Sequence, residues 1–264
     1  MTPAFEAAEI AALAAIFGSL GAMVIEVGGW TVLSRPDRPG HPWMHQVVAR
    51  GEVSADDLDE ALSLAGPTAQ VQVPDGVLGP AALVSRGFAV WSRLARMVGA
   101  VPGPPVPGPP GAASLIAASP VVVSSVSGSP AAWGLSLSVV GPEAAAEVVA
   151  VGLAGFDVGE SDWWPAPLGA PGWSQVLAHD GAVPVAMGAL HVSGPVAWVG
   201  AASTVPGHRR RGAQSALLAH RLQLAAQCGA EQVVSKVDPG GGSERNLRRA
   251  GFHPAYEVVQ WRRR

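Results

Sequence analysis

The chain has 264 residues, of which 48% are hydrophobic, nine are tryptophan and one, Cys228, is cysteine. This length and apolar content suffice for one large or two small folded domains, whereas a single cysteine excludes an intramolecular disulfide framework. The net charge of −3 hides a basic C-terminal part, since eleven Lys or Arg and four Asp or Glu follow Val205. Aromatic residues are not interleaved with these basic residues, and this pattern favours a small polyanion over nucleic acid as the partner.

The stretch from Ala11 to Leu33 is nearly apolar, but we expect it neither to cross a membrane nor to act as a signal sequence. Glu6 and Glu9 stand where a signal sequence carries basic residues, and several glycines divide the run. We therefore predict a helix at Phe5–Phe17 and one buried strand at Met23–Leu33, in a cytoplasmic protein without membrane contact.

The rest of the first hundred residues predicts a small α/β module. Ser54 is suited to cap a helix, because its hydroxyl can accept a hydrogen bond from the first turn. No metal site is predicted at His41 and His45, since Pro42 between them prevents a regular helix and no third ligand is evident. The predicted elements are a Pro-rich loop carrying both histidines, a helix at Ser54–Leu64, a strand at Ala69–Val73, a short helix near Ala81 and a strand at Phe88–Leu94.

A linker divides the chain, because ten of the thirteen residues from Gly99 to Gly111 are Gly or Pro. The predicted domains are therefore residues 1–98, a linker at 99–113 and a second domain at 114–264. Two-residue turns in the second domain predict antiparallel hairpins. Its predicted elements are strands at Val121–Val126 and Leu135–Val140, a helix from near Glu143, an aromatic loop at Gly159–Trp173 with Trp163 and Trp164, and strands at Gln175–Ala178, Val183–Val192, Val196–Val205 and Glu231–Val237.

A short repeat relates the two halves. Leu83 to Phe88 and Leu247 to Phe252 share the pattern Leu-x-x-x-Gly-Phe, each between a short helix and the last strand of its half. Glycine suits this place because helices commonly end on a left-handed residue. Together with the matching element order, the pattern favours duplication of one module.

The segment from Thr204 to Leu218 carries the clearest chemical signal, because it joins a predicted strand to an amphipathic helix. Backbone N–H groups at the helix start, the helix macrodipole and the guanidinium groups of Arg209, Arg210 and Arg211 together predict a pyrophosphate site. On the apolar side of this helix we expect Cys228 to be a buried small hydrophobe.

This segment resembles the pyrophosphate loop of the GCN5-related N-acetyltransferases (GNAT family), which reads Arg/Gln-x-x-Gly-x-Gly/Ala. The sequence Arg209-x-x-Gly212-x-Gln214 matches it except at the last position, and Pro206 and the Gly251-Phe252 turn also agree. The resemblance covers Leu135 to Trp261 well. It implies an α/β fold of two GNAT-like modules, each a mixed, mostly antiparallel sheet flanked by helices, of which the first is degenerate and lacks the loop.

The resemblance also implies a site for acetyl-CoA as cosubstrate. Backbone N–H groups near Ala202 and Ser203 would polarise the thioester carbonyl, Val205 would pair with the pantetheine amide, and the side chain of Gln214 would point away from the diphosphate. Asn246 would face the pantetheine arm, or else Ser243 caps a helix and Asn246 lies in its first turn. The implied cofactor-binding residues are Ala202, Ser203, Thr204, Val205, Arg209, Arg210, Arg211, Gly212, Ala213, Gln214, Ser215 and Asn246.

The reaction implied is direct attack of an amine on acetyl-CoA, which requires a base for the amine and benefits from an acid near the thiolate. Family members often carry a tyrosine where this chain has Leu247, so Tyr256, the only tyrosine, is the candidate acid. His191 and Glu160, with Asp162, are candidate bases. Each of these residues has a structural alternative.

The resulting prediction is an N-acetyltransferase that acts on the primary amine of a small molecule and binds no nucleic acid, membrane or metal, with a homodimer among the expected assemblies. Two alternatives stay open. The first is a non-catalytic module that binds acyl-CoA, favoured by Leu247 at the usual tyrosine position. The second is a basic C-terminal face that binds RNA or DNA.

Overall fold

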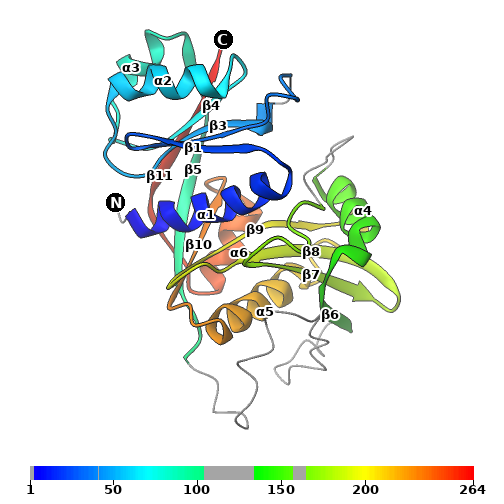
Figure 1. Ribbon diagram of the computed structural model, residues 1–264. Helices are drawn as coiled ribbons and strands as arrows, with labels where there is room; N and C mark the ends of the chain where they lie inside the picture. Colours follow the sequence, from blue (N-terminus) through cyan, green and yellow to red (C-terminus); the bar gives the residue numbers. More distant parts are fainter. Residues whose placement is uncertain (1–2, 41, 104–133, 157–164) are drawn as a thin grey trace. The chain divides into compact units, whose positions relative to one another are not determined.

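The computed structural model describes residues 3–40, 42–103, 134–156 and 165–264. They form two compact units (Figure 1): the first contains Met1–Val98 and Val234–Arg264, and the second contains Gly99–Val233. The last 31 residues of the chain therefore group with its N-terminal segment, whereas the predicted domains divide the chain only once, at the linker. Most of that linker, and the predicted strand at Val121–Val126, lie outside the described residues.

The first unit is a mixed sheet with helices on its faces. Its strand order is β1-β2-β3-β4-β11-β5-β10, with β3 and β4 parallel and the pairs around β11 antiparallel. The chain leaves this unit in β5 and returns to it in β10. Its elements are α1 (Pro3–Ser19), β1 (Met23–Val27), β2 (Trp30–Ser34), η1 (Pro42–Met44), β3 (His45–Ala49), α2 (Ala55–Ala65), β4 (Gln70–Pro74), α3 (Pro80–Val84), β5 (Phe88–Ala100), β10 (Gln232–Val237), α6 (Gly242–Arg249) and β11 (His253–Arg263).

The second unit is an antiparallel meander, with the strand order β9-β8-β7-β6. The predicted hairpins are present, but the first turn is Gly181-Ala182, one residue later than predicted, and residues 192–195 form a second connection longer than two residues. Its elements are β6 (Leu135–Val140), η3 (Pro142–Ala144), α4 (Ala145–Phe156), β7 (Trp173–Asp180), β8 (Val183–His191), β9 (Val196–Thr204), η4 (Pro206–His208) and α5 (Ala213–Gln227). Both units combine open sheets with flanking helices, so the predicted fold class is confirmed.

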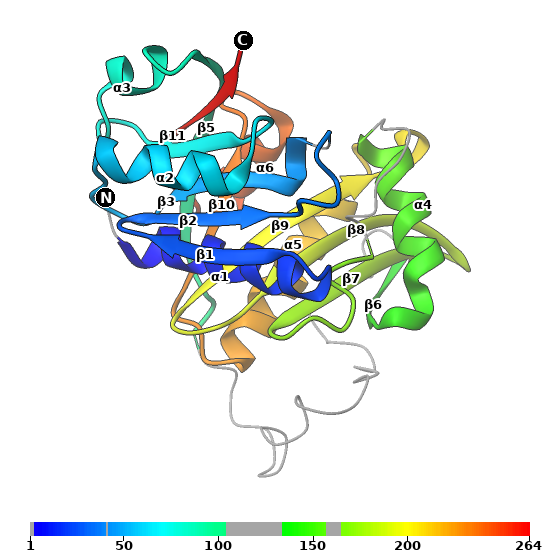
Figure 2. The same cartoon turned by 45° about the horizontal axis from the view of Figure 1, so that its top comes forward.

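The two faces of the first sheet differ in chemistry. Side chains alternate along a strand, so Val71 and Val73 of β4 face one side, where they pack in a core with Leu58 and Leu62 of α2. The opposite face carries buried polar side chains such as Gln72, and α1 covers part of it with Glu6 and Glu9. Helices α1 and α2 thus lie on opposite faces of this sheet (Figure 2).

In the second unit both faces of the sheet are apolar. Leu177 of β7 packs with Val148 and Val151 of α4, whereas its neighbours Val176 and Ala178 pack with Leu217 of α5. The alternation of side chains along β7 therefore places α4 and α5 on opposite faces. This arrangement places the start of α5 beside the end of β9 and the middle of β8.

The element order repeats along the chain, which accounts for the Leu-x-x-x-Gly-Phe pattern. A helix, three strands, a helix, a strand, a helix and a strand run from α1 to β5 and again from α4 to β11. Gly87 and Gly251 both have left-handed backbone, with φ of 82° and 88°. The last strand of the second set, however, lies between β4 and β5 of the first unit. This exchanged strand explains why Val234–Arg264 groups with the N-terminal segment.

Several local predictions need correction. The single strand predicted at Met23–Leu33 is a hairpin, because Gly28, with φ of 51°, and Gly29 form a two-residue turn. His45 begins a strand instead of lying in a loop. Cys228 is exposed, because α5 ends one residue before it. Ser243 does not cap α6, which begins at Gly242 with the backbone of Gly241 as its cap.

Candidate functional site

The predicted phosphate loop lies at the junction of β9 and α5, where the chain reverses through η4. Gly212 is the N-cap of α5 and has left-handed backbone with φ of 82°, a conformation that glycine adopts without steric cost. It supplies no side-chain cap, and the first helical hydrogen bond runs from the Ala216 N–H to its carbonyl. The helix start is therefore presented by backbone alone, as an anion site requires.

The arginines of the loop have different surroundings. Arg209 turns back onto the protein, where Nε donates to the carbonyl of Thr204 (3.2 Å) and Nη2 donates to that of Gly155 in α4 (2.9 Å). Arg210 is exposed and has a φ of 62°, which is uncommon for a residue with a side chain. Arg211 is exposed and lies 3.7 Å from the carboxylate of Asp180. Arg209 thus shapes the loop, and Arg210 extends from it into solvent.

Gln214 occupies the position at which the chain departs from the loop pattern, and its side chain points toward the strands. Its Nε2 donates to the carbonyl of Ser203 (2.7 Å), to Oγ1 of Thr204 (3.0 Å) and to the carbonyl of Met187 (3.3 Å). The glutamine therefore ties α5 to the middle of β8 and to the end of β9. A side chain longer than the Gly or Ala of the loop pattern is accommodated here, because carbonyl and hydroxyl oxygens beneath the loop accept hydrogen bonds from its amide.

A β-bulge interrupts β9 just before the loop. Ala189 of β8 pairs with Gly200 and Met187 pairs with Ser203, so three steps along β9 match two along β8. Ala201 has a φ of 45°, and a bulge of this kind redirects the backbone groups of the extra residue. Ala202 and Ser203, the predicted donors to a thioester, lie in this bulged segment.

Two other residues of the predicted site are engaged within the second unit. The N–H of Val205, expected to pair with pantetheine, donates to the carbonyl of Val185 (3.0 Å), and its carbonyl accepts from the N–H of His208 (3.0 Å). The hydroxyl of Ser203 donates to the carbonyl of Val151 in α4 (3.2 Å). The end of β9 is therefore held from both sides.

His191, a candidate base, lies at the end of β8 and is 3% exposed. Its ring packs against Trp173, with centroids 5.3 Å apart, and Trp173 in turn packs edge-on against Trp198. Burial lowers the pKa of His191 and so favours the neutral form of the ring. The other candidate bases, Glu160 and Asp162, and the tryptophans at 163 and 164 lie outside the described residues.

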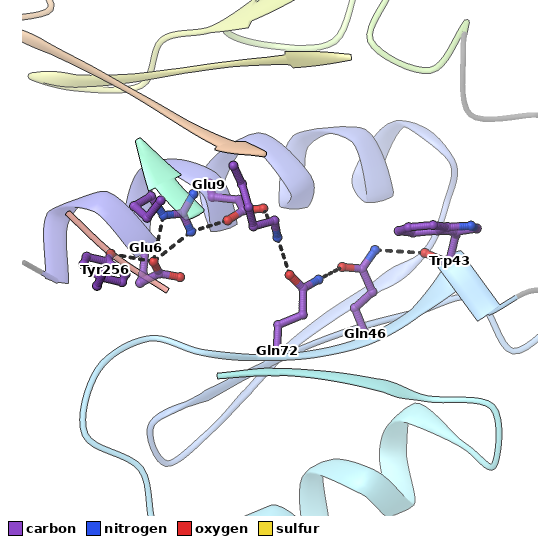
Figure 3. A network of polar contacts seen from close by, with 8 residues as sticks. Glu6, Glu9, Trp43, Gln46, Gln72 and Tyr256 are labelled. Atoms are coloured by element: carbon purple, nitrogen blue, oxygen red, sulfur yellow. Dashed lines mark hydrogen bonds and ion pairs between the residues drawn. The ribbon is translucent and has the colours of Figure 1, made fainter. Parts of the chain in front are cut away.

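Tyr256, the candidate acid, lies in the first unit on β11, opposite Arg96 of β5. Its hydroxyl donates to the carboxylate of Glu6 in α1 (2.6 Å), as Figure 3 shows. Burial and the neighbouring Glu6 raise the pKa of Tyr256, so its proton is retained at neutral pH. Asn246 also lies in the first unit, in α6, and Leu247 beside it is buried. The predicted site residues are thus distributed over both units.

The polar contacts of Tyr256 belong to a larger buried network (Figure 3). Arg96, with no exposed surface, donates through Nε and Nη2 to Glu6 (3.1 and 2.8 Å) and through Nη2 to Glu9. Lys236 of β10 forms an ion pair with Glu9 (2.6 Å). Two carboxylates and two cations therefore balance in charge. The network continues from Lys236 through Gln72 and Gln46 to the carbonyl of Trp43.

Two residues at the bulge, Ala201 and Arg221, were not predicted from the sequence. Arg221 stands on the apolar side of α5, three and four residues after Leu218 and Leu217, and it is buried. A basic residue within an apolar helical stripe is the signal that could have identified it. No such signal marks Ala201, because the bulge arises from pairing with β8.

The described residues contain no cluster of three or more His, Cys, Asp or Glu that could hold a metal ion. His45 is engaged at both ring nitrogens, by the hydroxyl of Ser34 and by the carbonyl of Arg38, each at 2.9 Å. Within the same described ranges, no helix has the length and apolar character needed to cross a membrane.

Comparison with protein-family models and with curated proteins yields no match to this chain. Among solved structures, a GCN5-related N-acetyltransferase from Kribbella flavida matches with a TM-score of 0.67 and 20% identity over 100% of this chain and 95% of its own. A GNAT-family acetyltransferase from Novosphingobium aromaticivorans matches at 0.57, with 18% identity over 94% and 96% of the two chains. A tandem GNAT protein from the clavulanic acid biosynthesis pathway matches at 0.54, with 15% identity over 88% and 78%.

These likenesses define the fold as that of the GCN5-related N-acetyltransferases, in an arrangement that fits two modules. At 15–20% identity these likenesses show the fold alone. The residues that would perform such a reaction in this chain must be argued from its own geometry.

Proposed function

We propose that the protein is an acetyl-CoA-dependent N-acetyltransferase that transfers the acetyl group to the primary amine of a small molecule in the cytoplasm. The fold supports acyl transfer in general. The observation that carries the proposal is the junction of β9 and α5. Within fifteen residues it contains, in chain order, a bulged strand, exposed arginines and a glycine N-cap with left-handed backbone.

The loop is suited to hold the diphosphate of acetyl-CoA. The α5 start offers backbone N–H groups and the positive end of the helix dipole, and Gly212 places no side chain over them. Arg210 and Arg211 add positive charge, although Asp180 competes for Arg211. Gln214 does not obstruct this face, since its amide is bound to the strands behind the loop.

The bulged segment of β9 would serve the other end of the cosubstrate. In the transfer step the amine nitrogen forms a bond to the acyl carbon, the carbonyl oxygen gains negative charge, and the C–S bond then breaks to release thiolate. Backbone N–H groups of the bulge would stabilise that charge. His191 and Glu160 are the candidate bases for the amine proton, and Tyr256, whose hydroxyl is bonded to Glu6, is the candidate acid for the thiolate.

The proposal is tested first by calorimetric titration with acetyl-CoA. We expect binding by the native protein and at least tenfold weaker binding by Arg210→Glu, because the reversal places a carboxylate beside the diphosphate. Arg264→Glu is the matched control, an exposed arginine reversed at the chain end. Absence of binding by the native protein would refute the proposal.

Turnover is then measured as thiol release from acetyl-CoA in the presence of amino acids, polyamines and aminoglycosides. Thiol release that depends on one of these amines supports the transferase. His191→Gln and Tyr256→Phe then assign the base and the acid, since each is expected to lower kcat with little change in acetyl-CoA binding if its group moves a proton.

A second candidate function is an acyl-CoA-binding module without catalytic activity. It is favoured by two observations: Leu247 is buried where family members often carry a tyrosine, and the hydroxyl of Tyr256 is committed to Glu6. Binding of acetyl-CoA without turnover of any amine in the panel would favour this function over the transferase.

A further inference from the structure

The β-bulge of β9 lies against a buried arginine on α5. Arg221 is 3% exposed, and its Nη1 donates to the carbonyl of Ala189 in β8 (3.0 Å) and to that of Gly200 in β9 (3.3 Å). Its Nε donates to the carbonyl of Leu217, one turn earlier in α5 (3.1 Å). One guanidinium therefore bridges the two strands at the place where their pairing becomes irregular.

This arginine has unusual surroundings for a buried cation. In the part of the chain that the structure describes, its hydrogen bonds go to carbonyl groups and it forms no ion pair with a carboxylate. Burial lowers the pKa of Arg221 to about 10, so it still carries its charge at neutral pH. Burying a charge without an opposite one is unfavourable, and an apolar side chain at this position would avoid that cost.

The strand opposite is adapted to the arginine. A Cβ atom at Gly188, between Met187 and Ala189, would lie 2.6 Å from Cζ of Arg221 and 2.9 Å from both Nη atoms. Only glycine therefore allows the guanidinium to approach the backbone of β8 at the bulge. The pair of Gly188 and Arg221 forms a built feature, because each is needed to accommodate the other.

The contact to Gly200 fixes the direction of a specific N–H group. Peptide bonds in the described residues are trans, so the carbonyl of Gly200 and the N–H of Ala201 point in opposite directions within one planar group. Holding that carbonyl toward Arg221 turns the N–H of Ala201 away from α5. The nearby positive charge also polarises this peptide group, which strengthens its N–H as a donor.

We propose that Arg221 is a positioning residue, which holds the Gly200–Ala201 peptide so that the N–H of Ala201 donates to the thioester carbonyl oxygen of the bound acyl-CoA. This inference rests on the proposed function. Arg221 touches no reacting atom. It acts through the peptide group, whose N–H stabilises the negative charge that the oxygen gains when the amine nitrogen bonds to the acyl carbon, before the C–S bond breaks and thiolate leaves.

The test compares Arg221→Met, which keeps an unbranched flexible side chain but removes the charge and the donors, with Arg221→Lys, which keeps the charge and one donor group. Gln227→Met, exposed on the same helix, is the matched control. Three quantities are measured: the Kd for acetyl-CoA, kcat with the amine found active, and the backbone amide resonance of Ala201 in a ¹⁵N-labelled sample.

For Arg221→Met we expect a Kd within about threefold of the native value and a kcat lowered by about 10- to 100-fold, somewhat less than the loss of a whole oxyanion donor. Arg221→Lys should recover part of the lost kcat. The Ala201 resonance should shift in both variants, more in Arg221→Met, and should not shift in Gln227→Met. A merely structural role would lower stability without separating kcat from Kd.

An Ala201 resonance that keeps its native position in folded Arg221→Lys, with native kcat, would overturn the inference even if Arg221→Met fails to fold. Loss of acetyl-CoA binding in parallel with kcat in both variants would also overturn it. The resonance is measured without ligand, so failure of the native protein to bind acetyl-CoA would refute the proposed function separately. In that case the Ala201 shift alone decides whether Arg221 orients the bulge.

Discussion

Replacing Arg96 by methionine should destabilise the first unit strongly, because this residue compensates two buried carboxylates. Arg96 has no exposed side-chain surface, and Glu6 and Glu9 are 1% and 5% exposed. After the replacement Lys236 can still pair with Glu9, but one negative charge in the network remains uncompensated. Removing one partner of a buried ion pair typically costs about 3–5 kcal/mol, and we expect the free energy of unfolding to fall by that amount at pH 7.

The same substitution should change how stability depends on pH. Burial alone would raise the pKa of Glu9, but Arg96 and Lys236 outweigh burial and lower it from 4.5 to about 2. That depression corresponds to roughly 3 kcal/mol of stability, present above pH 4.5 and lost as the pH falls toward 2. Without Arg96 the pKa of Glu9 rises. The difference between native protein and variant should therefore be largest near neutral pH and shrink on acidification.

Urea unfolding followed by tryptophan fluorescence between pH 3 and 8 measures both effects. The control is Arg93→Met on the same strand, whose side chain is 49% exposed and pairs with Asp75 and Glu257. Exposed pairs contribute about 0–1 kcal/mol, so this variant should resemble the native protein. If Arg96→Met lost less than about 1 kcal/mol, or its loss did not change with pH, the buried network would not have the energetic role assigned to it.

Two further predictions concern glycine and the exchanged strand. Gly172→Ala should destabilise the second unit by more than the cost of about 1–2 kcal/mol for a left-handed backbone, since the added Cβ would lie 2.7 Å from the carbonyl oxygen of Val192. Gly181 also has positive φ but has open space around it, so in urea titrations Gly181→Ala should show the backbone cost alone. Deletion of residues 253–264 should abolish cooperative unfolding of the first unit, because β11 lies between β4 and β5. Deletion of Arg264 alone is the control. An unchanged unfolding transition in the longer deletion would contradict the pairing.

Local signals in the sequence predicted most of the elements. The Ser54 cap is present, with the N–H of Asp57 donating to its hydroxyl at 3.1 Å, and the strand at Leu135–Val140 has the predicted bounds. The loop at Arg209–Gly212 could be found because its residues are adjacent in the chain. The hairpin at Gly28 was missed, since both of its strands are apolar in sequence and periodicity cannot separate two short apolar strands from one long one, although β1 is largely exposed and only β2 is buried throughout.

Features that depend on distant pairing left little trace in the sequence. The bulge at Ala201 exists only through its register with β8, and the Glu6 and Tyr256 side chains meet across 250 positions. Both glutamates of α1 could be read as an argument against a signal sequence, but nothing nearby in the chain indicated that they would be buried. Their partners come from β5, β10 and β11.

The buried charges also bear on why the exchanged strand has one register. A slip of β11 by one residue against β5 would turn Tyr256 to the opposite face of the sheet and leave Glu6 without that donor. The same slip would move Val259 and Trp261 out of the apolar core that they share with β4. A buried polar group that loses its partner is also costly. The network of α1, β5, β10 and β11 and the apolar core therefore both specify the pairing that joins the two ends of the chain.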